Sequence, residues 1–183
     1  IAEVFENVLS RSREKAYFYT PYQGDPELRR EIASFMATKG IKTDPGNIQV
    51  FSENNQALDF ILNLMLTPGD GVLMDETMSA DVYRTILLAG GKVIDVPADE
   101  HGILCDNLDI IIEKTRPKFI YVDSSFNNPK GTYLTVERKQ RLLELSYRYR
   151  MPVIEEDEGS ELYCDVEEIP YIKSMDRGGN VIY

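Results

Sequence analysis

Short runs of consecutive apolar residues alternate along this chain with longer segments in which apolar residues recur every three or four positions. Short continuous runs are typical of buried strands, and the wider spacing is typical of helices with one buried face. Strands are expected over residues 47–51, 71–75, 92–96, 118–122, 152–156 and 180–183. Helices are expected within residues 1–22 and over residues 26–39, 56–65, 80–89, 106–114 and 135–149.

This alternation predicts the fold class. Strands joined through helices form a mostly parallel sheet with helices on both faces, so a three-layer α/β/α fold is expected. Residues 1–22 are expected to form an N-terminal helix and arm, and residues 23–183 the N-terminal part of one large domain. Because the sequence stops inside an expected strand, we interpret the chain as a piece of a larger domain.

Composition narrows the classes of function. The 183 residues, 43% of them hydrophobic and 28% charged, are enough to bury one substantial core. The formal net charge of −11 repels phosphate backbones, so this segment is not expected to bind nucleic acid itself. No window is long and apolar enough to predict a membrane span, and nothing resembles a secretory signal.

The two cysteines and the single histidine add little chemistry. Cys105 and Cys164 lack the spacing of metal ligands and suggest no disulfide framework, so a reducing cytoplasm is the expected location. His101 stands in an expected loop with no Ser or Cys nucleophile to pair with, which favours an inert surface side chain.

The most informative segment runs from residue 119 to residue 131. An apolar run at residues 119–122 predicts a buried strand, and Asn128-Pro129-Lys130-Gly131 then breaks the chain at the strand's carboxyl end. Open α/β sheets bind their ligands at that end. Taken alone, these four residues are equally compatible with an ordinary turn, since Asn, Pro and Gly are the commonest turn formers.

Further segments stand in a characteristic order around this turn. They are Tyr19-Thr-Pro-Tyr-Gln-Gly24, Ser52-Glu-Asn-Asn-Gln-Ala57, Pro68-Gly-Asp70, Asp99-Glu-His-Gly102 and Val153-Ile-Glu-Glu-Asp157. In order and spacing, the chain resembles the large domain of the fold-type I pyridoxal 5'-phosphate (PLP) enzymes, the aminotransferase class I/II superfamily. It is most similar to the aminotransferase-like effector domain of GntR-family transcription regulators of the MocR type.

The resemblance implies a PLP site at the carboxyl edge of the sheet. The turn that contains Asn54 and Asn55 would hold the phosphate with backbone amides at a helix N-terminus. Asn128 would bond the phenolic oxygen of PLP. A carboxylate would keep the ring nitrogen protonated, and the resemblance places Glu156 or its neighbour Asp157 there, with Glu156 as our first assignment.

Two more features follow from the resemblance. In this superfamily a Tyr from a neighbouring subunit often reaches the phosphate, and Tyr19 matches it, which implies a homodimer. The lysine that forms the Schiff base should follow the strand that begins at Val181, beyond the end of this sequence. No catalytic residue is therefore expected here, and the chain alone is expected to be inactive. Lys130 is not interpreted as that lysine.

The chain also departs from the pattern of the superfamily. Glu53 places a negative side chain where Gly is usual and where a phosphate dianion should lie. Met78-Ser79 stands where an aromatic side chain usually stacks on the ring, and Glu158 replaces a usual Tyr. These departures disfavour a working aminotransferase.

Other interpretations of the same residues stay open. The run from Glu155 to Glu158 also fits a solvated charged segment or a site for a hard cation, although no metal site is expected because neither His nor an EF-hand spacing accompanies it. Tyr19, with Tyr17 and Tyr22, is also compatible with a core or dimer-interface role.

Three functions remain in competition. The first is a PLP-binding effector domain of a GntR/MocR-type regulator that senses PLP, an amine or an amino acid. The second is part of an active PLP-dependent aminotransferase. The third is a dimerisation scaffold that has lost the cofactor. Fold alone does not separate them, because function depends on the site.

Overall fold

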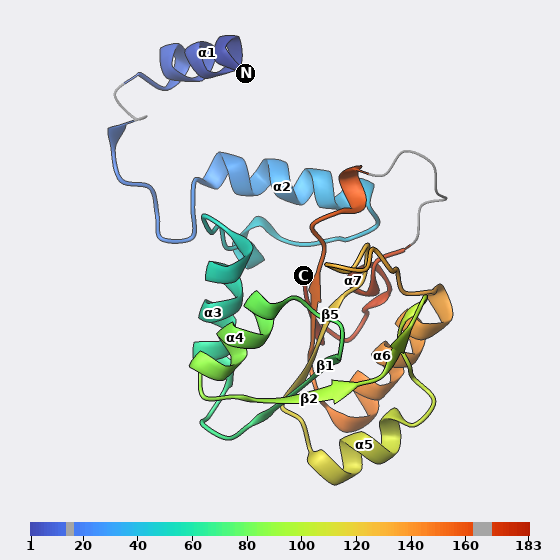
Figure 1. Ribbon diagram of the computed structural model, residues 1–183. Coiled ribbons are helices and arrows are strands. Elements are labelled where there is room, and N and C mark those ends of the chain that lie inside the picture. The colour runs from blue at the N-terminus through green and yellow to red at the C-terminus, as the bar shows by residue number, and fades with distance from the viewer. Residues whose placement is uncertain (14–16, 163–169) are drawn as a thin grey trace.

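A five-stranded, wholly parallel sheet forms the centre of the protein (Figure 1). The computed structural model describes residues 1–13, 17–162 and 170–183. In spatial order the strands are β2 (Lys92–Val96), β1 (Gly71–Asp75), β5 (Phe119–Asp123), β6 (Val153–Glu156) and β7 (Val181–Ile182). All five strands coincide, within one or two residues, with strands expected from the apolar runs.

Helices cover both faces of this sheet and confirm the three-layer α/β architecture. On one face, α3 (Asn54–Met65) and α4 (Ala80–Leu88) pack against Val72, Met74 and Tyr121. On the other, α5 (Leu108–Thr115), α6 (Val136–Tyr149) and α7 (Ile172–Met175) pack against Leu73, Ile120 and Val122. Alternate residues of β1 and β5 therefore face opposite cores, as strand geometry requires.

The N-terminal part extends away from these layers. α1 (Ala2–Ser12) buries no residue and lies apart from the sheet in Figure 1. α2 (Pro26–Thr38) begins at Asp25, whose carboxylate accepts the backbone N–H of Glu27 at 2.8 Å and of Leu28 at 3.0 Å. Its last turn joins the body through a small cluster of Met36, Ile41 and Tyr171.

Two expectations from the apolar pattern are wrong. Residues 47–51 form no strand, because a short 3-10 helix at Pro45–Asn47 precedes them and the Val50 N–H bonds only the Gln23 carbonyl at 3.0 Å. The expected loop near residue 100 is a small antiparallel hairpin of β3 (Ala98–Asp99) and β4 (Gly102–Ile103). Arg138 of α6 fixes it by a two-pronged ion pair with Asp99 at 2.6 and 2.7 Å. Among the described residues, no helix is long and apolar enough to cross a membrane.

Candidate functional site

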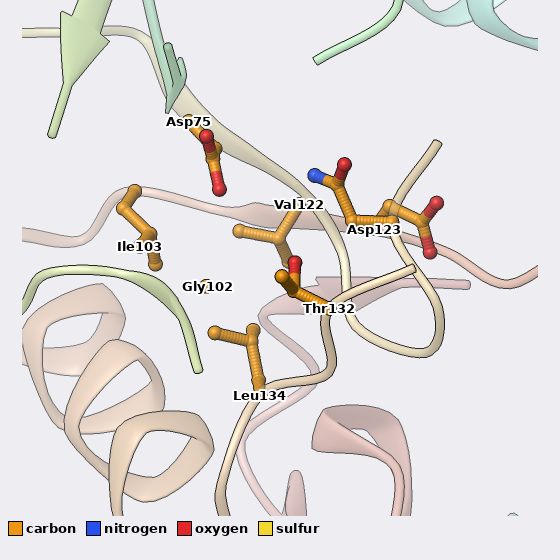
Figure 2. A pocket seen from close by; sticks show the side chains of 8 residues that line it. Asp75, Gly102, Ile103, Val122, Asp123, Thr132 and Leu134 are labelled. Carbon is orange, nitrogen blue, oxygen red and sulfur yellow. The ribbon is translucent and has the colours of Figure 1, made fainter. Parts of the chain in front are cut away.

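Three acidic side chains mark the carboxyl edge of the sheet, where neighbouring parallel strands end together. Asp75, Asp123 and Glu156 are the last residues of β1, β5 and β6. The register pairs Asp123 with Glu156, so the ends of β5 and β6 are adjacent. This is the edge at which open α/β sheets bind ligands, and Figure 2 shows a pocket there that Asp75, Thr132 and Leu134 help to line.

Asp123 organises the turn that follows β5. Its carboxylate accepts the backbone N–H of Ser125 at 3.4 Å and of Asn128 at 3.3 Å. Burial, reinforced by the charge of Glu156, raises the pKa of Asp123 to about 7. The turn leaves the side chain of Asn128 exposed, and the peptide bond between Asn128 and Pro129 is cis. The side chain expected to meet the cofactor is thus accessible at the edge.

The N-terminus of α3 presents backbone donors at the surface. Glu53 is the N-cap residue, yet its side chain caps no amide of the helix. Asn54 and Asn55 form the first turn, both exposed, two residues earlier than the apolar spacing predicts. A helix of this length carries partial positive charge at its N-terminus, which favours an anion such as a phosphate. Glu53 is exposed, so its charge is free to point into solvent.

The four carboxylates from Glu155 to Glu158 have different environments. Glu155 is only 2% exposed and accepts hydrogen bonds from the Ser124 hydroxyl at 2.6 Å and from the N–H groups of Ile172 at 2.8 Å and Lys173 at 2.7 Å. It therefore anchors the first turn of α7 to the sheet. Sequence reasoning missed this structural role, because a run of acidic residues favours a solvated surface.

Glu156 is half-buried on the other face of the strand. The Tyr121 hydroxyl donates a hydrogen bond to it. Burial raises the pKa of Glu156 above its usual range, and the same surroundings, burial first, raise the pKa of Tyr121.

Asp157 lies one residue beyond β6 and receives three donors. The Ser160 N–H donates to Oδ1 at 3.0 Å, and the Ser160 and Tyr183 hydroxyls both donate to Oδ2, the latter at 2.8 Å. Together these donors fix the orientation of the carboxylate. A carboxylate has about four lone-pair positions, so within the described residues one position on Oδ1 remains for a further donor.

The remaining predicted residues lie as follows. Glu158 is exposed, as a solvated member of the run should be, but it also accepts a hydrogen bond from the Asn54 side chain and so connects β6 with α3. Tyr19 is fully exposed, and its predicted contact with a neighbouring subunit stays a prediction. Cys105 is a buried free thiol, whereas Cys164 lies outside the described residues.

Asn127 is a site residue that sequence reasoning missed. It is only 3% exposed, its Nδ2 donates to the Met78 sulfur at 3.1 Å, and its Oδ1 is buried without a described partner. It lines the pocket of Figure 2. Its only sequence signal was its place beside Asn128, inside a turn whose side chains are usually exposed.

The chain belongs to the family of class I and II aminotransferases, whose family model matches residues 2–156. An uncharacterized aminotransferase of Saccharolobus solfataricus is 30% identical over the whole chain, which covers 47% of that protein. The HTH-type transcriptional regulator YdfD of Bacillus subtilis, also uncharacterized, is 29% identical over 92% of the chain, which covers 35% of it. Among solved structures, a kynurenine aminotransferase of Pyrococcus horikoshii in complex with PMP is similar over the whole chain, with a TM-score of 0.94 and 26% sequence identity. The match covers 46% of the length of that protein. The chain thus spans less than half the length of these relatives.

Proposed function

We propose that this chain forms the cofactor-binding edge for PLP in an aminotransferase-like effector domain of a GntR/MocR-type transcription regulator. The observation that carries the PLP assignment is the pair of features at one sheet edge. An uncapped N-terminus of α3 suits the phosphate, and a donor-stabilised carboxylate at Asp157 suits a protonated ring nitrogen.

The residues present fit the cofactor with one change of assignment. A carboxylate that pairs with a protonated ring nitrogen needs a lone pair open to that donor. The Tyr121 hydroxyl already engages Glu156, whereas three donors fix the orientation of Asp157 and one position on its Oδ1 stays free. We therefore assign the ring nitrogen to Asp157, leave Glu156 bonded to Tyr121, and keep Asn128 for the phenolic oxygen.

When bound, PLP supplies an electron sink for bonds at the amine carbon of a ligand. The residues of this chain bind and orient. The first-turn amides of α3 hold the phosphate, and Asp157 keeps a proton on the ring nitrogen. Glu53 opposes binding when it faces the phosphate, because like charges repel. The lysine for covalent attachment is proposed to lie beyond residue 183.

The regulator assignment rests on two positions, Ser79 and Glu158, at which this chain lacks the aromatic side chains usual in the enzymes. Ser79 caps α4 by accepting the Val82 N–H at 3.4 Å, and it offers no ring to stack on the cofactor. Glu158 stands where a Tyr is usual and bonds Asn54. Both changes remove side chains that the resemblance associates with the enzymes, and Glu158 also engages Asn54 of the proposed phosphate turn. We further propose a homodimer in the cytoplasm, with Tyr19 at the neighbouring site and an amine or amino acid as effector.

An active aminotransferase is the second candidate, and the similarity to proteins of that name favours it. The experiment is to load the intact protein with PLP and measure two signals, amino-group transfer to 2-oxo acids and binding to its promoter DNA. The proposal expects DNA binding that changes with PLP or an amine, and transfer close to that of free PLP. Rapid transfer without a DNA response would establish the enzyme instead.

A further inference from the structure

Lys39 lies at the end of α2, far from the acidic edge in sequence, and its side chain is only 8% exposed. The ammonium group lies 5.0 Å from the ring centres of both Phe35 and Tyr171. It donates a hydrogen bond to the Tyr171 hydroxyl at 2.9 Å and forms an ion pair with Glu161. A buried cation that donates to the Tyr171 hydroxyl polarises it, and so strengthens the hydrogen bond that this hydroxyl donates in turn.

A chain of hydroxyls leads from Lys39 to Asp157. The Tyr171 hydroxyl donates to Ser160 Oγ at 2.9 Å, and the Lys39 ammonium also donates to Ser160 Oγ directly, at 3.5 Å. The Ser160 hydroxyl donates in turn to Asp157 Oδ2. Tyr171 is 5% exposed, so water does not easily replace this link.

The direction of these hydrogen bonds is fixed by the group at their origin. A lysine ammonium only donates, so Tyr171 accepts from Lys39 and uses its own proton on Ser160. Ser160 then uses its proton on Asp157. Each hydrogen bond polarises the next. The N–H and hydroxyl of Ser160 and the hydroxyl of Tyr183 occupy three lone-pair positions of Asp157, so the fourth, on Oδ1, remains free.

We propose that Lys39 is a positioning residue for the cofactor ring: through Ser160, which it contacts directly and by way of Tyr171, it orients Asp157 toward the ring nitrogen. This proposal rests on the proposed PLP function and extends it to a residue on α2. Lys39 itself touches no cofactor. Lys39 has a second, structural role, because its ion pair with Glu161 helps to anchor α2 to the rest of the protein.

The test compares two ligands on the intact protein, PLP and the 1-deaza analogue of PLP, in which carbon replaces the ring nitrogen. Only PLP has a ring nitrogen that can pair with Asp157. The ratio of the two dissociation constants therefore measures the contact between Asp157 and the ring nitrogen. Four single variants and one double variant are measured with the wild type. Lys39→Met removes the cation and Lys39→Arg keeps it. Tyr171→Phe removes the hydroxyl link while keeping the ring packed, Glu161→Gln removes only the ion pair, and the double variant combines Lys39→Met with Tyr171→Phe.

The wild type is expected to bind PLP at least tenfold more tightly than the analogue. Lys39→Met should reduce this preference about tenfold. Tyr171→Phe should reduce it less, because the direct contact of Lys39 with Ser160 Oγ remains, and the double variant should lose no more than Lys39→Met alone, because both substitutions act through Ser160. Glu161→Gln and Lys39→Arg should keep the preference. An unchanged preference in Lys39→Met would overturn the inference and leave the PLP assignment standing. Absence of PLP binding in the wild type would overturn the proposed function itself.

Discussion

At the scale of single residues, Glu156 and Asp157 are neighbours with different surroundings. The Tyr121 hydroxyl contacts Glu156, whose pKa is raised by burial, whereas Asp157 has three donors and a free lone pair. The sequence alone could not separate them, because the end of the strand fixes their register only to within one residue. The environment that separates them comes from Ser160 and Tyr183, which no motif indicated.

This difference predicts unequal effects of two isosteric substitutions. Asp157→Asn should weaken PLP binding by the intact protein about a hundredfold, since losing one partner of a buried ion pair costs about 3 kcal/mol and 1.4 kcal/mol corresponds to tenfold. Glu156→Gln should change it less than threefold. Equilibrium titration followed by absorbance measures both. A strong loss in Glu156→Gln with none in Asp157→Asn would return the assignment to Glu156.

Asp123 predicts a dependence of stability on pH. Its pKa is about 7 in the folded protein against an ordinary value of 3.8. Because the folded state holds this proton more tightly, its contribution to stability is complete below pH 3.8 and is lost as the pH rises toward 7. The stability of Asp123→Asn relative to the wild type should therefore rise between pH 3.8 and about 7, by a few kcal/mol at most.

Urea unfolding at several pH values measures this difference. Asn retains the size of Asp123 but only one acceptor oxygen, so one of the hydrogen bonds from the Ser125 and Asn128 N–H groups is lost. That loss lowers the stability of the variant equally at every pH, so only the change of the difference with pH reports the titration of Asp123. A difference between variant and wild type that stays constant with pH would show that Asp123 does not titrate in this range.

At the scale of elements, Glu155 connects β6 to α7. Glu155→Ala should destabilise the protein by about 3–5 kcal/mol, because it leaves two backbone N–H groups and one hydroxyl without their buried acceptor. Glu158→Ala, at an exposed position three residues later, should cost less than about 1 kcal/mol. Chemical denaturation distinguishes them. Equal losses would contradict the structural role of Glu155.

The elements were largely predictable and their chemistry was not. Continuous apolar runs predicted all five sheet strands, since a parallel strand buried on both faces has no polar alternation. Residues 47–51 misled the same rule, because this short segment with apolar residues is a partly exposed loop that pairs with no strand. The hairpin of β3 and β4 has only two residues in each strand and is held by Arg138, which is distant in sequence. A local sequence pattern could therefore not predict it.

At the scale of the whole molecule, the net charge bears on DNA binding and the sheet topology bears on cofactor binding. A net charge of −11 argues against direct DNA contact by this chain, so a regulator needs another domain for that task. The parallel sheet brings the ends of β1, β5 and β6 to one edge, and residues 157–160 link that edge to α2 through Tyr171 and Lys39. The resemblance located this edge, while the hydrogen bonds behind it required the structure.

PLP binding by the intact protein is the most direct test of the account. Titration with PLP, then borohydride treatment and mass spectrometry, reports both affinity and covalent attachment. The account predicts saturable binding with an absorbance band that borohydride abolishes, one phosphopyridoxyl group per chain on a lysine outside residues 1–183, and much weaker binding by Asp157→Asn. No saturable binding, or attachment to Lys130 or another lysine of this chain, would contradict it.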